Sequence, residues 1–275
     1  MKQIFGASFA IVFLAALAGL VSVSKHSRTI LPIVYAQSGC TYASLASNYA
    51  FTLSGWATPP PKVLTEGKSS IPIVAVGIAA FDGAGNWTTT FTYSHNGDIS
   101  SAISVPGTYT VNSNCTGTLT GAAEFSVVIV DGGAEITGVG TDNDTTSTIT
   151  MRKQNATGCS NSTLTGNYAI TLAGFGTPST KLVPANPSVP LALAGLATFD
   201  GAGNLTVSFT SSDNGDISPL RSDAGSYTVS SDCAGTITDE TAGVDFATVV
   251  LAGGTEVFGV QTDVGTAATF ELKKQ

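Results

Sequence analysis

The strongest constraint on the fold of this chain is an internal tandem repeat of its sequence. The hexapeptide Phe-Asp-Gly-Ala-Gly-Asn occurs at residues 81–86 and again at 199–204, 118 residues later. Matches at nearly the same spacing continue on both sides, and the copies end alike at Lys153-Gln154 and Lys274-Gln275. Each copy has about 115 residues, which is long enough to bury a core of its own. The sequence therefore predicts two similar domains in tandem.

Within each copy, apolar residues alternate with polar ones. Trp87, Phe91 and Tyr93 are separated by threonines, and the matching stretch at 204–210 has the same pattern. A period of two indicates strands with one buried face. The same reasoning predicts eight strands in the first copy, at roughly residues 48–56, 72–82, 86–95, 106–112, 115–120, 124–131, 134–141 and 146–153.

The connections between these strands predict how the strands pair. Most are short and rich in Gly, Asn and Asp, so successive strands become antiparallel neighbours. Eight such strands in order favour an up-and-down barrel, which leaves no open edge. We therefore expect an all-β fold of two tandem eight-stranded antiparallel up-and-down barrels. Two β-sandwiches are the alternative.

The four cysteines occupy equivalent positions in the two copies. Cys40 matches Cys159 and Cys115 matches Cys233, so each copy has one pair. In a secreted chain, four cysteines imply disulfides. Pairing Cys40 with Cys115 and Cys159 with Cys233 makes each domain self-contained. Strand parity also places both cysteines of a pair at the barrel end that carries the hexapeptide turn.

Residues 1–36 resemble a targeting segment. An apolar run from Ile4 to Val23 follows Lys2, and Val34-Tyr35-Ala36 forms a small-residue cleavage site. The run is also long enough to span a bilayer if it stays uncut. The expected organisation is a signal peptide or N-terminal membrane anchor (1–36), a first barrel repeat (37–154), a linker (155–158) and a second barrel repeat (159–275). Such a protein is secreted or held at the cell surface.

The charge of the mature part excludes several classes of partner. Without Lys2, Lys25 and Arg28, the chain keeps 8 basic and 19 acidic residues, a net charge of −11. Phosphate backbones and anionic lipids repel such a chain. We expect no nucleic-acid partner, and a membrane contact only through an uncleaved N-terminal segment.

The predicted unit resembles the calycins, the barrel superfamily of lipocalins, fatty-acid-binding proteins and avidins. Lipocalins begin the first strand with Gly-x-Trp and pack a cation from the last strand on that ring. Here Asn48-Tyr49 and Gly166-Asn167-Tyr168 take the first position, with Tyr for Trp, and Arg152 and Lys273 close the last strands. The Pro-rich segment 57–70 resembles the lipocalin loop that covers the barrel mouth. The pattern also resembles uncharacterised secreted bacterial tandem-repeat proteins.

No motif indicates catalysis, a cofactor or a metal site. The sequence Asp82-Gly-Ala-Gly-Asn86 lacks the alternating Asp ligands and closing Glu of an EF-hand, and it is better explained as a turn. His95 is the only histidine beyond residue 36, and its counterpart in the second copy is Asp213. A solvated loop residue is the expected role of His95. The scattered acidic residues suit a soluble surface better than paired acid–base catalysis.

The aromatic residues are the remaining candidates for function. They either line a ligand cavity or fill the barrel, because an eight-stranded barrel is just wide enough for one small ligand. We expect a filled or nearly filled interior. Trp56 and Phe175 near the mouth, with Tyr49 and Tyr168, are the candidate ligand-binding residues. The expected function is non-enzymatic binding of a small apolar molecule or a cell-surface component. A structural or adhesive cell-envelope module with filled barrels is the alternative.

Overall fold

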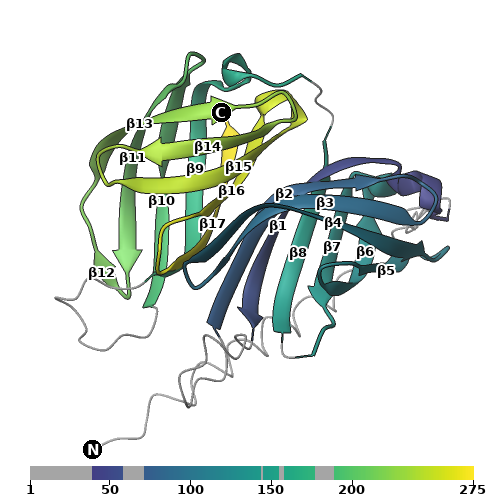
Figure 1. The fold of residues 1–275 in the computed structure, drawn as a ribbon. Helices are drawn as coiled ribbons and strands as arrows, with labels where there is room; N and C mark the ends of the chain where they lie inside the picture. The colour runs from purple at the N-terminus through teal and green to yellow at the C-terminus, as the bar shows by residue number, and fades with distance from the viewer. Residues whose placement is uncertain (1–38, 58–70, 144, 155–157, 177–188) are drawn as a thin grey trace, which may run out of the picture. The chain divides into compact units, whose positions relative to one another are not determined.

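The computed structural model of this chain describes residues 39–57, 71–143, 145–154, 158–176 and 189–275, and these residues form two β-barrels (Figure 1). The targeting segment expected at 1–36 lies outside the described residues. So does nearly all of the Pro-rich segment 57–70. Among the described residues, no helix is long and apolar enough to cross a membrane.

The first barrel closes through eight antiparallel strands in chain order, with the last strand pairing with the first (Figure 1). Tyr49 lies opposite Lys153 in that closing pair. The strands are β1 (Ser47–Ala57), β2 (Ile71–Phe81), β3 (Asn86–His95), β4 (Asp98–Val111), β5 (Thr116–Thr120), β6 (Glu124–Val130), β7 (Glu135–Gly140) and β8 (Thr145–Lys153).

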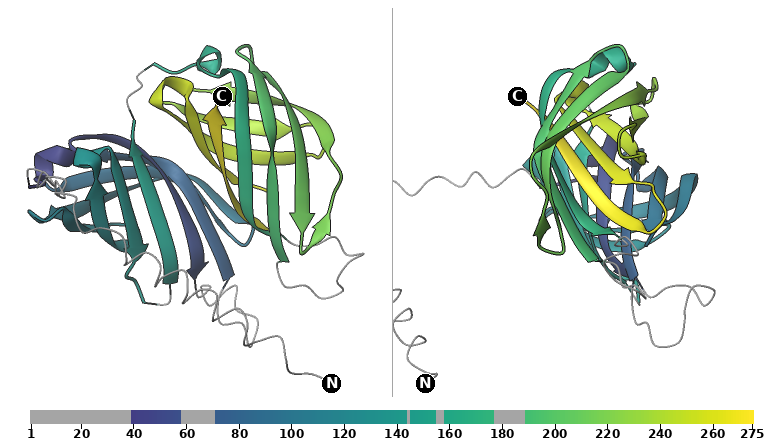
Figure 2. Two further views of the ribbon diagram at one scale, coloured as in Figure 1. Left: turned by 180° about the vertical axis from the view of Figure 1, so that it is seen from behind. Right: turned by 90° about the vertical axis from the view of Figure 1, so that its left-hand side faces the viewer.

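The second barrel repeats this order, and β17 pairs with β9 to close it (Figure 2). Its strands are β9 (Thr165–Gly176), β10 (Val189–Asp200), β11 (Asn204–Asp213), β12 (Asp216–Ile217), β13 (Arg221–Val229), β14 (Ala234–Asp239), β15 (Val244–Leu251), β16 (Glu256–Gln261) and β17 (Thr266–Lys274). The short β12 is an extra strand paired with β11.

The predicted fold class is confirmed, and the predicted strands agree closely with the observed ones. One strand differs, because β4 begins at Asp98 rather than near 106. The turn at Asn96-Gly97 has positive φ angles of 52° and 91° at its two residues, so it closes a tight hairpin and pairing starts at once. The second copy has Pro219 where the first has Ser101, and there the strand is divided into β12 and β13. Proline cannot donate to a strand ladder.

The repeated hexapeptide is the turn between β2 and β3, and between β10 and β11. The Asp82 carboxylate accepts hydrogen bonds from the backbone amides of Ala84 (2.7 Å) and Asn86 (3.0 Å), and from Asn86 Nδ2 (2.7 Å). Asp200 makes the same set of bonds with Ala202 and Asn204. These bonds satisfy both carboxylate oxygens within the turn, as the turn prediction requires.

The two turns make stability depend on acid. The hydrogen bond from Asn204 is the largest cause that lowers the pKa of Asp200, to about 2. This folded-state pKa lies below the unfolded-state pKa of about 3.9. The ionised carboxylate therefore stabilises the folded protein fully above about pH 3.9, and this stabilisation is lost as the pH falls through the folded-state pKa. Asp200→Asn keeps the turn but cannot titrate. Its thermal midpoint should therefore fall less between pH 5 and pH 2 than that of the wild type, and an equal fall would contradict this origin.

The end of each barrel that carries this turn is filled. Disulfides Cys40–Cys115 and Cys159–Cys233 lie there, as predicted. In the first barrel, the Phe81 ring packs against Tyr49, Trp87 and Tyr109 with centroid distances of 5.0–5.4 Å. The Tyr49 hydroxyl donates to the carbonyl of Gly133 at 2.6 Å, and Tyr168 donates to Gly254 in the same way. Burial raises the pKa of Tyr49 to about 12. We call this the closed end.

The two barrels pack together within residues 37–275, which form one compact unit. The first barrel contributes the outer faces of β1 and β2, and the second contributes those of β15, β16 and β17. The contact is apolar, and its buried members are Ala50, Val74, Val76, Val249, Leu251, Phe258, Val260 and Ala267. Ser94 Oγ also donates to the carbonyl of Thr266 at 2.6 Å, and Gln154 Nε2 to that of Val250 at 3.2 Å.

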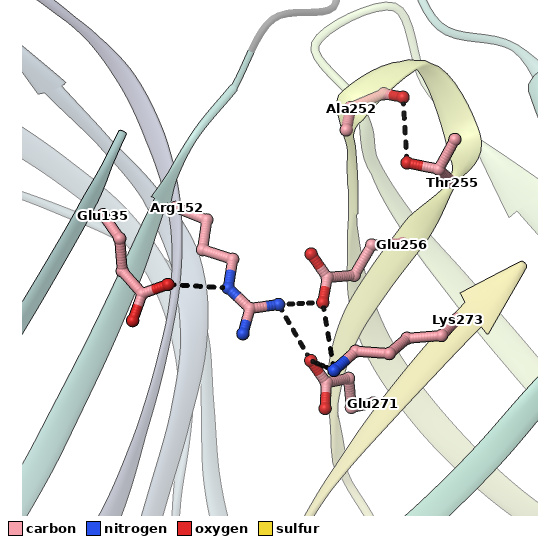
Figure 3. A network of polar contacts seen from close by, with 7 residues as sticks. All are labelled: Glu135, Arg152, Ala252, Thr255, Glu256, Glu271 and Lys273. Carbon is pink, nitrogen blue, oxygen red and sulfur yellow. Dashed lines mark hydrogen bonds and ion pairs between the residues drawn. The ribbon is translucent and has the colours of Figure 1, made fainter. Parts of the chain in front are cut away.

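A charged network borders this contact (Figure 3). The Arg152 guanidinium reaches from Glu135 of its own barrel, at 3.4 Å, to Glu256 and Glu271 of the second barrel. It also lies over the Phe258 ring, 5.3 Å from the centroid. The expected packing of Arg152 and Lys273 on the first-strand tyrosines is therefore wrong. Side chains at 152 and 273 point outward, and Lys274 lies over Tyr168 instead.

The sequence difference between the copies explains which faces meet. Strand β2 is apolar on both faces and almost wholly buried, whereas β10 alternates between exposed and half-buried residues along most of its length. Val74 and Val76 are replaced by Ala192 and Ala194 in the second copy. Conversely, the outward Phe258 has an exposed threonine, Thr137, as its counterpart. A strand that is buried on both faces has a nearly continuous apolar sequence, as β2 does.

Candidate functional site

The first barrel has a cavity of about 360 Å³ at the end opposite its disulfide. The lining includes the beginning of β2, at Ile73 and Ala75, and the inward positions of β3 from Trp87 to His95. Apolar side chains dominate it, including Phe51, Leu53 and Ile149. The volume lies in the lower part of the range usual for small-molecule pockets, roughly 300–1,000 Å³.

Aromatic side chains line this cavity from its floor to its mouth. Trp87 lies toward the floor, is 6% exposed, and donates its indole N–H to the carbonyl of Thr120 at 3.1 Å. Above it, the rings of Phe91 and Tyr93 are 6.0 Å apart, and Tyr93 and His95 are 4.7 Å apart. All of these side chains are on β3, where a period of two points them inward.

His95 is half-buried at the mouth of this cavity. The expectation of a solvated loop residue is therefore wrong. It is the last residue of β3 and continues the inward face of that strand. Burial lowers the pKa of His95, and the Asp98 carboxylate opposes this effect. The imidazole therefore favours its neutral form, which suits an apolar cavity.

The second barrel has a cavity of about 220 Å³ in the equivalent place, and its mouth differs in chemistry. The inner part is apolar, with Leu172, Phe246 and Phe270 among its residues. Polar side chains ring the outer part: Ser211, Asp213, Arg221, Asp223, Asp239 and Gln261.

Arg221 and Asp223 are the centre of this polar ring. Both point inward from β13, on the same face as the buried Tyr227. Arg221 Nε lies 3.4 Å from Asp223 Oδ2, and the guanidinium stacks over the Phe209 ring, 4.4 Å from its centroid. Asp223 is only 7% exposed, and its Oδ2 has no hydrogen-bond partner. Burial is the main cause that raises the pKa of Asp223, and nearby Asp239 raises it further while Arg221 lowers it.

The first barrel has apolar or small residues at the corresponding positions. Ile103 and Val105 take the places of Arg221 and Asp223, and Gly140 takes the place of Gln261. The strand registers agree with this alignment, since Phe125 pairs with Gly140 and Phe246 with Gln261. The two cavities therefore occupy the same place in the fold but offer different surfaces.

The structure brings two of the predicted site residues together, but on the outside of the barrels. Trp56 and Phe175 point outward from β1 and β9, and their rings meet edge to face with centroids 4.8 Å apart. Trp56 is 38% exposed. Neither residue is in the lining of the two open-end cavities formed by the described residues. Successive side chains of a strand point to opposite faces, so both rings point outward because the residues beside them in the chain point inward.

The other two predicted site residues belong to the closed ends. Tyr49 and Tyr168 are fully buried, and neither lines the cavities at the open ends. Their hydroxyl groups are bound to the glycine carbonyls of the closed end. A ligand contact for these residues remains a prediction without support from their positions.

The polar ring of the second cavity has no counterpart in the first copy, so the repeated residues do not predict it. The alternation along β13 does contain a signal for it. Tyr227 matches Tyr109 and marks the inward face, and counting back by twos reaches Gly225, Asp223 and Arg221. Charged residues on an inward face, opposite aliphatic residues in the other copy, indicate a functional difference.

Comparison with known proteins adds no assignment: no family model matches the chain, and no curated protein matches it. Within the parts of the chain that the structure describes, no group of three or more His, Cys, Asp or Glu side chains is arranged to hold a metal ion.

Proposed function

We propose that this protein is a secreted or surface-held, non-enzymatic binding protein that takes a small apolar molecule into the open end of its first barrel. The carrying observation is the cavity of about 360 Å³, whose lining is almost entirely aromatic and aliphatic. Burial of apolar surface supplies roughly 25 cal/mol per Å² toward binding. The paired disulfides support an oxidising, extracytoplasmic location.

The proposal includes membership of the calycin-like barrels. Support comes from the closed up-and-down order of eight strands, the filled end with its 3₁₀ turn η1 (Tyr42–Leu45), and the open end with its cavity. The alternative of a structural or adhesive module assumed filled barrels. Filling is found at the closed ends, whereas both open ends are hollow, so the geometry favours binding.

A variant that fills the first cavity tests the proposal. Ala75 is 5% exposed and lines the cavity, so Ala75→Phe should block it. Ala194→Phe places the same ring on an exposed outer position of β10 and serves as the control. Purified full-length protein should release an apolar molecule on solvent extraction, and native mass spectrometry should show its mass on the wild type and on Ala194→Phe, but not on Ala75→Phe.

The outcome also separates the candidate functions. If the wild type carries no molecule and binds none of a panel of added apolar compounds, small-molecule binding is excluded. Cell or self-binding by that same empty protein would favour the structural module.

A further inference from the structure

The second barrel contains a polar group that its packing does not explain. Replacing a buried ion pair by aliphatic residues of similar size is often neutral or favourable to stability, because both charges must be desolvated. The first barrel has such residues, Ile103 and Val105, at the positions of Arg221 and Asp223. The second barrel instead holds Asp223, 7% exposed, with one oxygen that accepts no hydrogen bond.

The ion pair between Arg221 and Asp223 is weak. Arg221 is the nearest cation, but its side chain is 51% exposed at the mouth, and its contact with Asp223 is a single 3.4 Å approach without hydrogen-bond geometry. A long, half-exposed side chain can turn toward solvent at little cost when another cation takes its place. The carboxyl group is therefore available to a donor that enters the cavity.

The charge around the cavity mouth favours a cation. Asp213, Asp223 and Asp239 all line the cavity, against the one guanidinium of Arg221. Beneath them the lining is apolar, with the rings of Phe246 and Phe270 packed edge to face at 5.2 Å. A ligand that fits both parts has an apolar body and a positively charged end.

We propose that the second barrel is a separate binding site for a small aliphatic or aromatic amine, whose ammonium group binds the Asp223 carboxylate while its apolar part fills the inner cavity. This inference rests on the proposed function, because it assumes that the barrels take ligands at their open ends. It adds that the two barrels select different ligands. The raised pKa of Asp223, caused mainly by burial and also by nearby Asp239, agrees with a carboxyl group that lacks a sufficient cationic partner within the barrel.

Three ligands of one chain length test the selection: hexylamine, hexan-1-ol and hexanoate. Amide chemical shifts distinguish the barrels, because Ser211 and Ala224 line the second cavity whereas Thr89 and Ala123 line the first. In the full-length protein, hexylamine should shift Ser211 and Ala224 with a dissociation constant about tenfold or more below that of hexan-1-ol, as expected for a hydrogen bond to a charged group. Hexanoate should bind the second barrel most weakly.

Asp223→Val gives the second barrel the residue of the first. It should remove the preference, weakening hexylamine by about tenfold or more while hexan-1-ol changes little. Asp216→Val removes an exposed carboxylate at the same end of the barrel and should leave both affinities unchanged. The Arg221 side chain is 51% exposed and can turn toward solvent, so removing Asp223 leaves no buried unpaired charge. Asp223→Val should therefore melt no lower than the wild type.

Several results would overturn the inference. Tighter binding of hexanoate than of hexylamine would assign recognition to Arg221. An unchanged hexylamine affinity in Asp223→Val would exclude the Asp223 carboxylate as the binding group. Hexylamine-induced shifts confined to Thr89 and Ala123 would place the amine in the first barrel. Titration with hexane, followed at Thr89 and Ala123, tests the first barrel separately. Failure of the amine site is therefore distinguished from failure of the proposed function.

Discussion

Threonine in place of Phe258 should lower the free energy of unfolding by about 3–5 kcal/mol, the usual cost of deleting a buried phenyl ring. Phe258 is 3% exposed, lies in the apolar contact between the barrels and carries the Arg152 guanidinium over its ring. Its loss weakens the coupling of the two barrels. Calorimetry should then show two separate unfolding transitions where the wild type shows one.

Thr137 provides the matched control, because it is the exposed counterpart of Phe258 in the first barrel. Thr137→Ala should change stability by less than about 0.5 kcal/mol. A Phe258→Thr variant that unfolds in one transition, with stability close to that of the wild type, would show that the apolar contact does not hold the barrels together.

Loss of one disulfide should destabilise its own barrel by about 4 kcal/mol, the chain-entropy estimate for a loop of this length. The bridge between Cys159 and Cys233 spans a sequence separation of 74 residues. In the Phe258→Thr variant, whose barrels unfold separately, the double substitution Cys159→Ser, Cys233→Ser should lower the stability of the second barrel while the first barrel keeps its own bridge. Chemical denaturation followed by amide shifts in each barrel measures the two effects separately.

The equivalent pair, Cys40→Ser and Cys115→Ser, is the internal comparison, and it should weaken the first barrel selectively. Equal loss in both barrels from either substitution would contradict the view that each disulfide serves only its own barrel.

The fold could be predicted from the sequence because its signals are local and occur twice. Alternation along β3, the glycine-rich turns and the paired cysteines all indicate the same barrel, and each signal has a match in the second copy. Among the predicted strands, only β4 begins at a clearly different residue. The tight Asn96-Gly97 turn lets strand pairing begin at Asp98, before the region where apolar alternation becomes visible in the sequence.

The candidate site was less predictable because it depends on the direction of single side chains and on space. Trp56 is a large ring near the mouth, but its even position on β1 points it toward Phe175 rather than into the cavity. Whether eight strands enclose a filled or a hollow interior depends on how rings divide between the two ends. Here the largest cluster, around Phe81, is at the closed end.

Differences between the copies were more informative than their similarities. Shared residues such as Tyr49 and Tyr168, or the hexapeptide turn, maintain the barrel. Residues that differ mark either the contact between the barrels, as at Phe258, or the chemistry of a cavity, as at Asp223. In a duplicated domain, alternation first assigns the faces, and comparison of the copies then locates specialised surfaces.

Quenching of Trp87 tests the central claim most directly, that the first barrel takes a small apolar molecule at its open end. The chain has two tryptophans, so Trp56→Phe leaves Trp87, at the cavity, as the only one. Titration with 1-bromohexane should quench its fluorescence to a plateau, with one molecule bound at the first barrel, and hexane should reverse the effect. Quenching that rises without a plateau, as in a Trp87→Phe variant that retains only Trp56, would contradict the account.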